Sequence, residues 1–303
     1  MVDIVKCIGN TPLIRLSNSV TKCHANILVK LEEYNWGGSV KSRVAYQMIL
    51  DAEQSGIIDK HSSNVTLIEA TGGNTGIGIA QICSLRGYHC ILVVPNNYSK
   101  VRISILKKLG ADVILSDHLL GNDSHIKKVE EIKKSNPDLV HLNQFSNISN
   151  IKAHYSGTAQ EIFQQLNDTI DGFVAGIGSG GTVTGIGRAI KERFPEAKIY
   201  GVQPQGCDVL NGKAIPHVIQ GIAIGYIPTI LDESLLNGIF DIKEQEIYEM
   251  EANLLKKSGL YLGKSSIANI VGAVKMSIKH PELRTIVTVA PDGGRNYIDN
   301  ETI

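Results

Sequence analysis

The sequence lacks a surplus of either charge, because 30 basic residues are balanced by 30 acidic ones over 303 positions. A chain without net charge has no overall field that would attract nucleic acid or an anionic membrane surface. Aromatic residues make up only 5% of the chain, and Trp36 is its single tryptophan, which argues against a base-stacking surface. We therefore expect no nucleic-acid or membrane partner, and any ligand must be recognised by a local site.

Clustered cysteines and long apolar runs are also missing. The N-terminus shows no basic segment followed by an apolar one, and no apolar run approaches the ~20 residues that a membrane span requires. The cysteines are odd in number and have no C-x-x-C spacing, which is typical of reduced thiols and indicates no metal site. The sequence therefore predicts a cytoplasmic protein. The scattered cysteines are Cys7, Cys23, Cys83, Cys90 and Cys207.

Short apolar runs rich in β-branched residues alternate with segments of helical periodicity, which is typical of parallel sheets covered by helices on both faces. The length favours about two domains. We predict an α/β fold of two lobes, each a mostly parallel twisted sheet flanked by helices, with the ligand in the cleft between them. The predicted strands cover residues 27–31, 65–68, 90–94, 113–115, 173–177, 199–202 and 285–289. The predicted helices cover residues 39–55, 74–85, 100–109, 124–134, 153–165, 182–194, 244–257 and 265–278.

A glycine-rich stretch, Gly176-Ile-Gly-Ser-Gly-Gly-Thr-Val-Thr-Gly185, follows one predicted strand and opens a helix. Glycines at such a junction let the backbone approach an anion, and the helix N-terminus offers unpaired N–H groups to a phosphate. Ser179, Thr182 and Thr184 add hydroxyl donors. A tight turn needs only one or two glycines, whereas five occur here within ten residues. The pattern therefore favours phosphate binding.

The same stretch contains G-x-G-x-x-G, so a dinucleotide site is the competing interpretation. That fingerprint requires an acidic residue at the end of the next strand to hold the ribose, but the strand at 199–202 is followed by Gln203 and Pro204. A P-loop is excluded because no Gly-Lys-Ser/Thr closes the segment. A simple phosphate ester remains the favoured ligand, and a nicotinamide oxidoreductase the weaker alternative.

A second junction, Asn35-Trp-Gly-Gly-Ser-Val-Lys-Ser-Arg43, leads into a helix for which Ser39 is the expected cap. Lys41 then lies in the first turn, where the helix dipole opposes its positive charge. Most lysines on helices are simply exposed and solvated. A lysine with a lowered ammonium pKa behind a Gly-Gly-Ser turn is instead suited to forming a Schiff base.

A third junction, Thr71-Gly-Gly-Asn-Thr-Gly76, again joins an apolar strand to a helix. Its backbone N–H groups and hydroxyls form a concavity suited to a carboxylate or a second anion. Alone it is compatible with an ordinary capped turn. Three such junctions in one chain indicate a small zwitterionic substrate beside a phosphorylated cofactor.

These motifs together resemble the fold-type II pyridoxal-phosphate (PLP) enzymes, specifically the cysteine synthase and cystathionine β-synthase family, which is related to the tryptophan synthase β subunit. The resemblance runs from Ile8-Gly-Asn-Thr-Pro-Leu13 to Pro291-Asp-Gly-Gly-Arg-Asn-Tyr297. It implies PLP as the cofactor, a small amino-acid substrate and a small nucleophile as partners, and a homodimer. We assign residues 1–12 and 35–146 to a smaller N-terminal lobe with the substrate loop. Residues 13–34 and 147–303 form the larger C-terminal lobe with the PLP phosphate loop.

Site residues follow from the resemblance, position by position. It implies that Lys41 forms the Schiff base and acts in catalysis, that Asn74 hydrogen-bonds the ring hydroxyl of PLP, and that Ser265 faces the pyridine nitrogen. The residues implied to hold the phosphate are Gly178, Ser179, Gly180, Gly181 and Thr182. The residues implied to bind the substrate carboxylate are Thr71, Gly72, Asn74, Thr75 and Gln144.

The activity implied is β-replacement on an activated serine, a transferase of EC 2.5.1 type. The first choice is cysteine synthase, which converts O-acetyl-L-serine and sulfide to L-cysteine and acetate through an aminoacrylate intermediate. A hydroxyl at the pyridine nitrogen favours elimination of a β-leaving group. Alternatives with the same chemistry are an O-phosphoserine-dependent synthase, cystathionine β-synthase, a diaminopropionate-type synthase and a cysteine lyase that releases hydrogen sulfide. Serine/threonine dehydratase and a non-catalytic homologue rank lower.

Several positions depart from the family pattern, and they concern the substrates rather than the cofactor. Trp36 stands where proline is usual, and Ser42 replaces an aspartate. Gly72 replaces a serine or alanine in the substrate loop. Further departures are Lys264 and Ile267 beside Ser265, and the loop Gly221-Ile-Ala-Ile-Gly225. The identities of the amino-acid donor and of the nucleophile therefore stay open.

Overall fold

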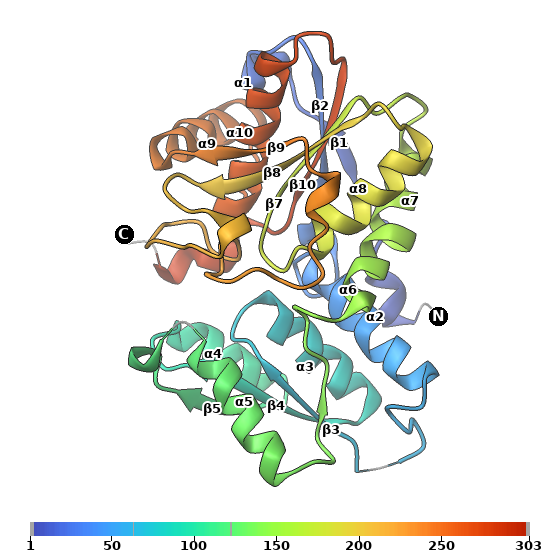
Figure 1. Ribbon diagram of the computed structural model, residues 1–303, viewed down its shortest axis with the longest axis vertical. Helices are drawn as coiled ribbons and strands as arrows, with labels where there is room; N and C mark the ends of the chain where they lie inside the picture. The colour runs from blue at the N-terminus through green and yellow to red at the C-terminus, as the bar shows by residue number, and fades with distance from the viewer. Residues whose placement is uncertain (1–2, 63, 122, 301–303) are drawn as a thin grey trace.

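The chain forms two lobes, one above the other in Figure 1, in a computed structural model that describes residues 3–62, 64–121 and 123–300. Each lobe is built around its own sheet, and helices cover both faces. Among the named strands of the described chain, β1 and β2 are the antiparallel pair, and the other pairs run parallel. The predicted α/β fold with two mostly parallel sheets is confirmed.

The larger lobe contains a six-stranded sheet whose middle strands are buried on both faces. The last of them in the chain, β10, has every residue buried, which explains why it reads as a continuous apolar run. In spatial order the strands are β1 (Leu13–Arg15), β2 (Asn26–Leu31), β10 (Thr285–Ala290), β7 (Gly172–Gly176), β8 (Lys198–Pro204) and β9 (Gly238–Ile242).

The smaller lobe contains a four-stranded sheet. Successive residues of a strand point to opposite faces, so Leu67 packs with the helices on one side and Ile68 with the helix on the other. Burial of each such side chain stabilises the fold by about 1.5–3 kcal/mol. In spatial order the strands are β5 (Asp112–Ser116), β4 (His89–Pro95), β3 (Thr66–Ala70) and β6 (Val140–His141).

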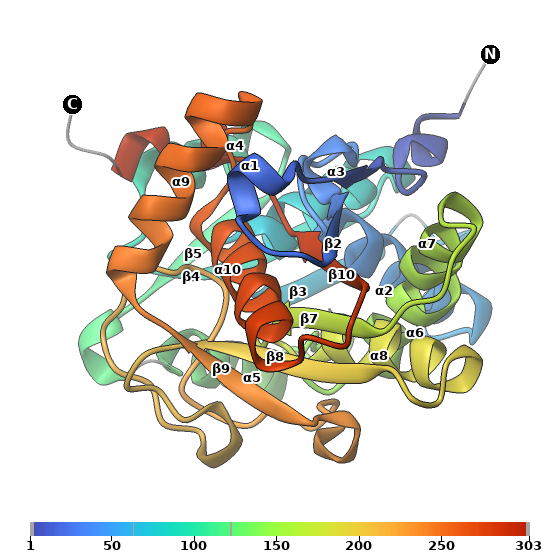
Figure 2. The same cartoon turned by 90° about the horizontal axis from the view of Figure 1, so that it is seen from above.

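Helices of the larger lobe cover its sheet on both sides (Figures 1 and 2). One side carries α9 (Glu244–Ser258), α10 (Lys264–Lys279) and the short α1 (Asn18–Thr21), and the other carries α7 (Ala159–Gln165) and α8 (Gly181–Arg193). In the smaller lobe, α2 (Lys41–Gln54), α3 (Asn74–Arg86) and α4 (Lys100–Lys108) cover one face of the sheet, and α5 (Ser124–Ser135) covers the other.

One predicted helix has a different internal geometry. The segment 153–165 continues from α6 (Ile148–Lys152) through a π-helix at Ala153–Thr158 into α7. Helix α8 packs closely against this segment, since a Cβ on Gly185 would lie 2.7 Å from the Cβ atom of His154. The remaining short helices are 3₁₀ turns at Ile4–Cys7, Glu32–Tyr34, His118–Leu120, Val209–Asn211, Glu233–Leu235 and Gly294–Asn300.

All seven predicted strands are present, but three strands escaped prediction. Two of them, β1 and β6, are only three and two residues long, and β9 interrupts its apolar pattern with Asp241. Strands β1 and β2 join the larger sheet although they come first in the chain, which is compatible with the predicted division of the lobes. The boundaries of that division stay a prediction.

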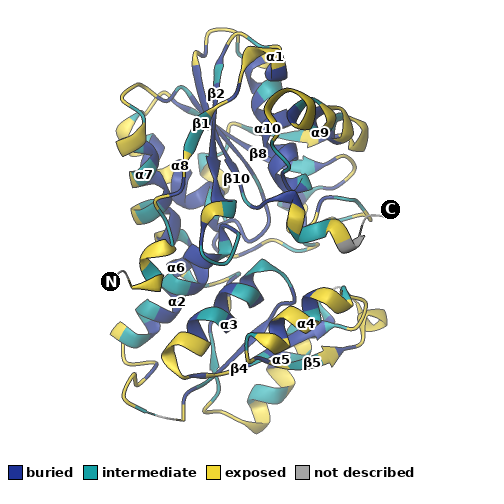
Figure 3. Cartoon of the chain, turned by 180° about the vertical axis from the view of Figure 1, so that it is seen from behind, coloured by how far each residue is buried: buried dark blue, intermediate teal, exposed yellow. Residues whose placement is uncertain are grey.

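Burial is concentrated in the two sheets and in the helix faces that touch them, as Figure 3 shows by colour. Within the described ranges, no helix has the length and apolar character needed to cross a membrane.

Candidate active site

A cavity of about 270 Å³ lies between the lobes, at the carboxyl ends of the parallel strands. The segments that follow β3, β6, β7 and β10 all contribute to its wall, which is where ligands bind in parallel α/β sheets. Two of the predicted site residues, Gly72 and Gly181, do not line it. Those that do are Lys41, Thr71, Asn74, Thr75, Gln144, Gly178, Ser179, Gly180, Thr182 and Ser265.

Lys41 is the first residue of α2 and projects into this cavity. Its side chain is half-buried because it faces the hollow, while its amine lies deep within the protein. Burial lowers the pKa of Lys41 to about 8, although the Asp292 carboxylate opposes the shift. Val40 is the N-cap of this helix, and not Ser39 as the sequence predicted. The Ser39 hydroxyl still accepts a hydrogen bond from the backbone N–H of Lys41 at 3.3 Å.

A cradle of backbone forms where β7 leads into α8. Gly180 has φ +82°, which a side chain would strain. A Cβ on Gly178 would lie 2.1 Å from the Gly221 carbonyl oxygen, and one on Gly181 would lie 2.0 Å from the Asn150 amide oxygen. Only glycine therefore fits at these three positions, and their backbone reaches the start of a 13-residue helix.

Two hydroxyls complete the cradle. Ser179 accepts a hydrogen bond from the Asn150 amide at 3.0 Å, and Thr182 lies 3.2 Å from Nε2 of His154. Thr184, the third hydroxyl that the sequence suggested, points elsewhere: it accepts the Asp232 backbone N–H at 3.0 Å and does not line the cavity. The prediction for Thr184 is therefore wrong, because the helix turns its side chain away from the cradle.

Another part of the cavity wall carries polar atoms that lack partners. The Asn74 amide nitrogen donates to the Asp292 carboxylate at 2.7 Å, but Oδ1 of each residue is buried without a hydrogen bond. Ser265, the second residue of α10, is also buried at this wall. Buried polar atoms are normally satisfied, so this surface is built to receive a polar ligand.

The turn between β3 and α3 presents its backbone to the same cavity. The Gly73 N–H donates to the Thr71 hydroxyl at 3.4 Å, and the Thr75 hydroxyl donates to Oε1 of Gln144 at 2.7 Å. Gln144 is set in place from behind, since its backbone N–H donates to the buried Glu69 carboxylate at 3.3 Å. Burial raises the pKa of Glu69 to about 7, although backbone donors oppose the shift.

Comparison with known proteins identifies the family. A model of the pyridoxal-phosphate dependent enzymes matches residues 4–292. The chain belongs to this family. The recognition made from the sequence motifs is confirmed, and so is PLP as the cofactor of this enzyme.

Three relatives illustrate the similarity of this PLP-dependent enzyme to others. A cysteine synthase of Flavobacterium is 40% identical over 262 residues, which cover 86% of this chain and 84% of that one. A hydrogen sulfide-producing enzyme from Fusobacterium nucleatum has a solved structure with a TM-score of 0.91 and 38% identity, covering 98% of each chain. An O-acetylserine dependent cystathionine β-synthase from Helicobacter pylori gives a TM-score of 0.91 and 36% identity, covering 100% of this chain and 98% of that one.

The residues present fit PLP in chemistry and in space. The glycine cradle with its two hydroxyls suits a phosphate at a helix N-terminus. A lysine amine with its pKa lowered to about 8 lies in the same cavity. The unpartnered Oδ1 atom of Asn74 leaves polar capacity for a ring substituent.

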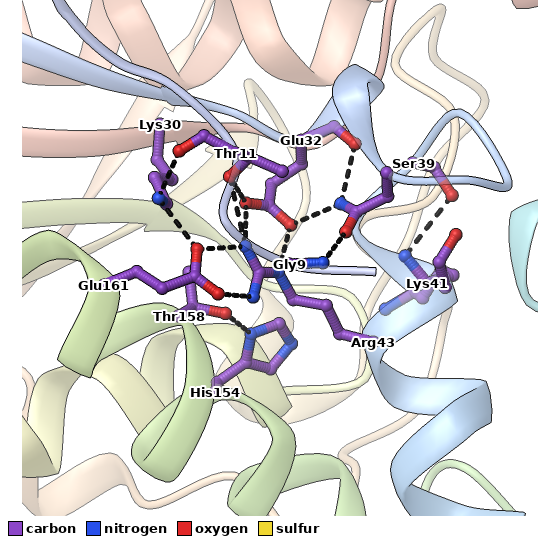
Figure 4. Close-up of polar contacts among 12 residues, drawn as sticks. Gly9, Thr11, Lys30, Glu32, Ser39, Lys41, Arg43, His154, Thr158 and Glu161 are labelled. Atoms are coloured by element: carbon purple, nitrogen blue, oxygen red, sulfur yellow. Dashed lines mark hydrogen bonds and ion pairs between the residues drawn. The ribbon is translucent and has the colours of Figure 1, made fainter. Parts of the chain in front are cut away.

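A buried ion network holds helix α2, which begins with Lys41, against the larger lobe (Figure 4). Arg43, two residues after Lys41, contacts the Glu32 carboxylate at 2.5 Å and the Glu161 carboxylate at 2.7 Å. Lys30 contacts Glu161 at 2.9 Å from the other side. Because these partners come from β2, the turn after it and α7, the network fixes the start of α2 from three directions.

The departures from the family pattern have local explanations in this enzyme. The Ser42 hydroxyl accepts the Gly37 backbone N–H at 3.0 Å. Ile267 is fully buried in the core of the larger lobe, and the Lys264 ammonium lies 5.3 Å from the centre of the Tyr248 ring. Trp36 packs against the core of the smaller lobe.

Several cavity residues were not assigned from the sequence. Asp292 and Tyr297 belong to a motif that carried the family resemblance but had no stated role. The others come from helices and loops whose patterns look ordinary, so no sequence signal marked them: Tyr98, Arg102, His125, Gln220 and Tyr226.

Proposed function

We propose that this enzyme catalyses β-replacement on O-acetyl-L-serine with sulfide, which yields L-cysteine and acetate. One observation carries the proposal: a single cavity combines the Lys41 amine, the glycine cradle at α8 and the polar turn at 71–75. The similarity to a cysteine synthase at 40% identity supports the choice of substrates.

The glycine cradle at the start of α8, together with Asn74 and Ser265, would hold PLP between the lobes. Backbone N–H groups at 178–182 with the Ser179 and Thr182 hydroxyls would bind the phosphate, and Asn74 would contact the ring hydroxyl. Ser265 would face the pyridine nitrogen with a neutral hydroxyl. Bound PLP supplies an electron sink that acidifies the α-proton of an amino acid and lets a β-substituent depart.

Lys41 would move the α-proton. An amine with its pKa near 8 exchanges a proton readily at neutral pH, which suits a general base at Cα and later an acid at the same atom. The turn formed by Thr71, Gly72, Asn74 and Thr75 would bind the substrate carboxylate. Gln144, held by Thr75, would complete that site and fix the orientation of Cα toward the lysine.

Cysteine is the second candidate donor, in which case the enzyme would release hydrogen sulfide. The similarity to the Fusobacterium hydrogen sulfide-producing enzyme over 98% of both chains favours it. The loop at 221–225 is also altered from the family pattern, and it contributes Gly221, Ile222 and Ile224 to the cavity wall. The nucleophile would then be water or another small molecule in place of sulfide.

A homodimer in a reducing compartment belongs to the same proposal. All five cysteines are unpaired, including the buried neighbours Cys83 and Cys90, which is compatible with the cytoplasm. Sedimentation of the purified protein at micromolar concentration tests the dimer, and a monomer that retains full activity would contradict it.

Borohydride reduction tests the role of Lys41. The PLP-loaded protein is reduced and digested, and the peptide with residue 41 is expected to carry the cofactor mass. Lys41→Ala should lose the label and all β-replacement while keeping its fold by circular dichroism. Lys100→Ala is the matched control, because Lys100 is also the first residue of a helix but is exposed. Turnover retained in Lys41→Ala overturns the assignment.

A substrate panel tests the choice of donor. O-acetylserine, O-phosphoserine, serine and cysteine are each mixed with the enzyme, with and without sulfide, and amino-acid products are measured by chromatography. Cysteine formation from O-acetylserine with the highest kcat/KM supports the first candidate. If O-acetylserine does not react and cysteine releases sulfide, the second candidate replaces it.

A further inference from the structure

The Asp292 carboxylate is a buried charge in the catalytic cavity for which the reaction above has no use. It follows β10 at the carboxyl edge of the larger sheet and is 1% exposed. One oxygen, Oδ2, accepts hydrogen bonds from the Asn74 amide at 2.7 Å and from the Tyr297 hydroxyl. The other oxygen, Oδ1, is buried without a partner. Burying a carboxylate is costly unless a positive group compensates it.

The backbone brings this carboxylate to the lysine. Ser39, two residues before Lys41, forms an antiparallel bridge with Asp292. The next residue, Val40, donates its N–H to the Pro291 carbonyl at 2.8 Å. The segment that presents Lys41 is thus fastened to the segment that presents Asp292, and both side chains line the same cavity.

The electrostatics agree with this placement. Burial dominates at both groups, lowering the pKa of Lys41 and raising the pKa of Asp292, and each charge partly offsets the shift of the other. Asp292 also faces Arg102 from α4, Tyr297 from the C-terminal 3₁₀ helix and Glu33 from the turn after β2.

Arg102 also contacts other groups, although its Nε atom is buried without a hydrogen bond. Its guanidinium donates to the Asn296 carbonyl at 3.0 Å and stacks over the Tyr297 ring at 4.5 Å. The pKa of Glu33 is raised by burial, with Arg295 opposing the shift and Asp292 adding to it. Both cations compensate the carboxylate, Arg102 more strongly than Lys41, and the charge of Asp292 in turn raises the pKa of Lys41 against the effect of burial.

We propose that Asp292 is the counter-ion of the Lys41 nitrogen and a positioning residue for the Asn74 amide. The carboxylate keeps positive charge on that nitrogen inside a cavity that otherwise disfavours it. By accepting one N–H of Asn74, it also fixes the amide so that the second N–H and Oδ1 face the ligand. The proposal deepens the one above, since it rests on the Schiff-base role of Lys41.

Asp292→Asn tests the counter-ion, because it removes the charge and keeps the shape. In protein freed of PLP, the rate of acylation of Lys41 is followed by mass spectrometry across pH. The midpoint is expected near 8 in the parent protein. In the variant we expect it about one pH unit lower, a tenfold loss of proton affinity. In PLP-loaded protein, the visible absorption band is titrated, and it should lose its protonated form at lower pH in the variant.

Glu33→Gln is the matched control, because it makes the same change at a carboxylate that faces Asp292 but does not line the cavity. It should leave both midpoints unchanged. Equal midpoints in Asp292→Asn and the parent protein overturn the proposal. If Asp292→Asn does not fold, Asp292→Ser replaces it: this variant removes the same charge, so the midpoint should fall in the same direction, and no fall overturns the proposal.

Failure of this proposal and failure of the proposed function give different results. The acylation midpoint is measured without substrate or PLP, so it responds to Asp292 even if O-acetylserine is not the donor. Conversely, unchanged midpoints alongside normal cysteine synthesis would reject the counter-ion and leave the reaction standing.

Discussion

Gly178→Ala tests the cradle that we assign to the PLP phosphate. A Cβ at this position would lie 2.1 Å from the Gly221 carbonyl oxygen, far inside the 3.4 Å at which ordinary van der Waals contact begins. The φ of Gly178 is not in the left-handed region, so the added methyl group costs energy through this contact alone. The neighbour is backbone and cannot rotate away, so either the cradle or the 221–225 loop must move.

The size of the effect follows from this contact. Overpacking of this kind costs about 1–3 kcal/mol of stability. The shift also misdirects backbone N–H groups, and a lost hydrogen bond to a charged group costs about 1.5–3 kcal/mol. Since 1.4 kcal/mol corresponds to tenfold in affinity, we expect PLP to bind roughly 10–100 times more weakly.

Two measurements check the prediction. The dissociation constant of PLP is determined by absorption titration, and the free energy of unfolding of the cofactor-free protein by urea denaturation. Gly157→Ala is the control, because its Cβ would make only an ordinary contact with Nη1 of Arg43 at 3.8 Å, its φ is not in the left-handed region, and it does not line the cavity. It should lower neither PLP affinity nor stability. Unchanged affinity and stability in Gly178→Ala would refute the close approach of the two loops.

Three further predictions concern the substrate turn and the ion network. Thr75→Val removes the hydroxyl that donates a hydrogen bond to Gln144, and loss of one neutral hydrogen bond costs about 0.5–1.5 kcal/mol. The variant should raise KM for the amino-acid substrate several-fold, with a smaller change in kcat. Unchanged steady-state kinetics would contradict this role of Thr75. Arg43→Met leaves the buried carboxylates of Glu32 and Glu161 without their positive partner. The free energy of unfolding, measured by urea denaturation, should fall by about 3–5 kcal/mol. An unchanged urea midpoint would show that the ion network does not stabilise the fold. Burial raises the pKa of Glu161, but the hydrogen bond to Arg43 prevails and holds it at about 2. The folded pKa lies below the ordinary value of 4.5, so this stabilisation is present above that pH and is lost as the pH falls toward 2. In Glu161→Gln, the free energy of unfolding should therefore fall less than in the parent protein as the pH is lowered from 4.5 toward 2. The same fall in both proteins would count against the ion pair.

Local patterns predicted most of the fold because each buried parallel strand is apolar on both faces. The strands at 285–289 and 173–177 were found in this way. By contrast, β6 is two residues long and exists because β3 supplies its hydrogen-bond partners. Such a strand has no pattern of its own, so only the tertiary structure reveals it.

The three glycine-flanked junctions were predictable for a related reason. An anion held by backbone requires glycine at fixed spacing next to a helix start, and that requirement is visible in the sequence. The pairing of Asn74 with Asp292 was not, because the two residues lie 218 positions apart. Arg43 and Glu161 are likewise separated by 118 positions, and neither residue type signals its partner.

The glycine at position 72, where the family usually has serine or alanine, is explained by its neighbours in the folded protein. A Cβ at this position would lie 2.4 Å from the Val94 side chain and 2.7 Å from the Tyr98 ring. The space that a serine or alanine side chain would need is therefore occupied from the neighbouring strand and the loop after it. Since Tyr98 lines the cavity and Gly72 does not, the shape of this wall is set by the tyrosine. The two positions thus form one unit: glycine at 72 permits Tyr98 to reach the cavity, and Tyr98 excludes a larger residue at 72.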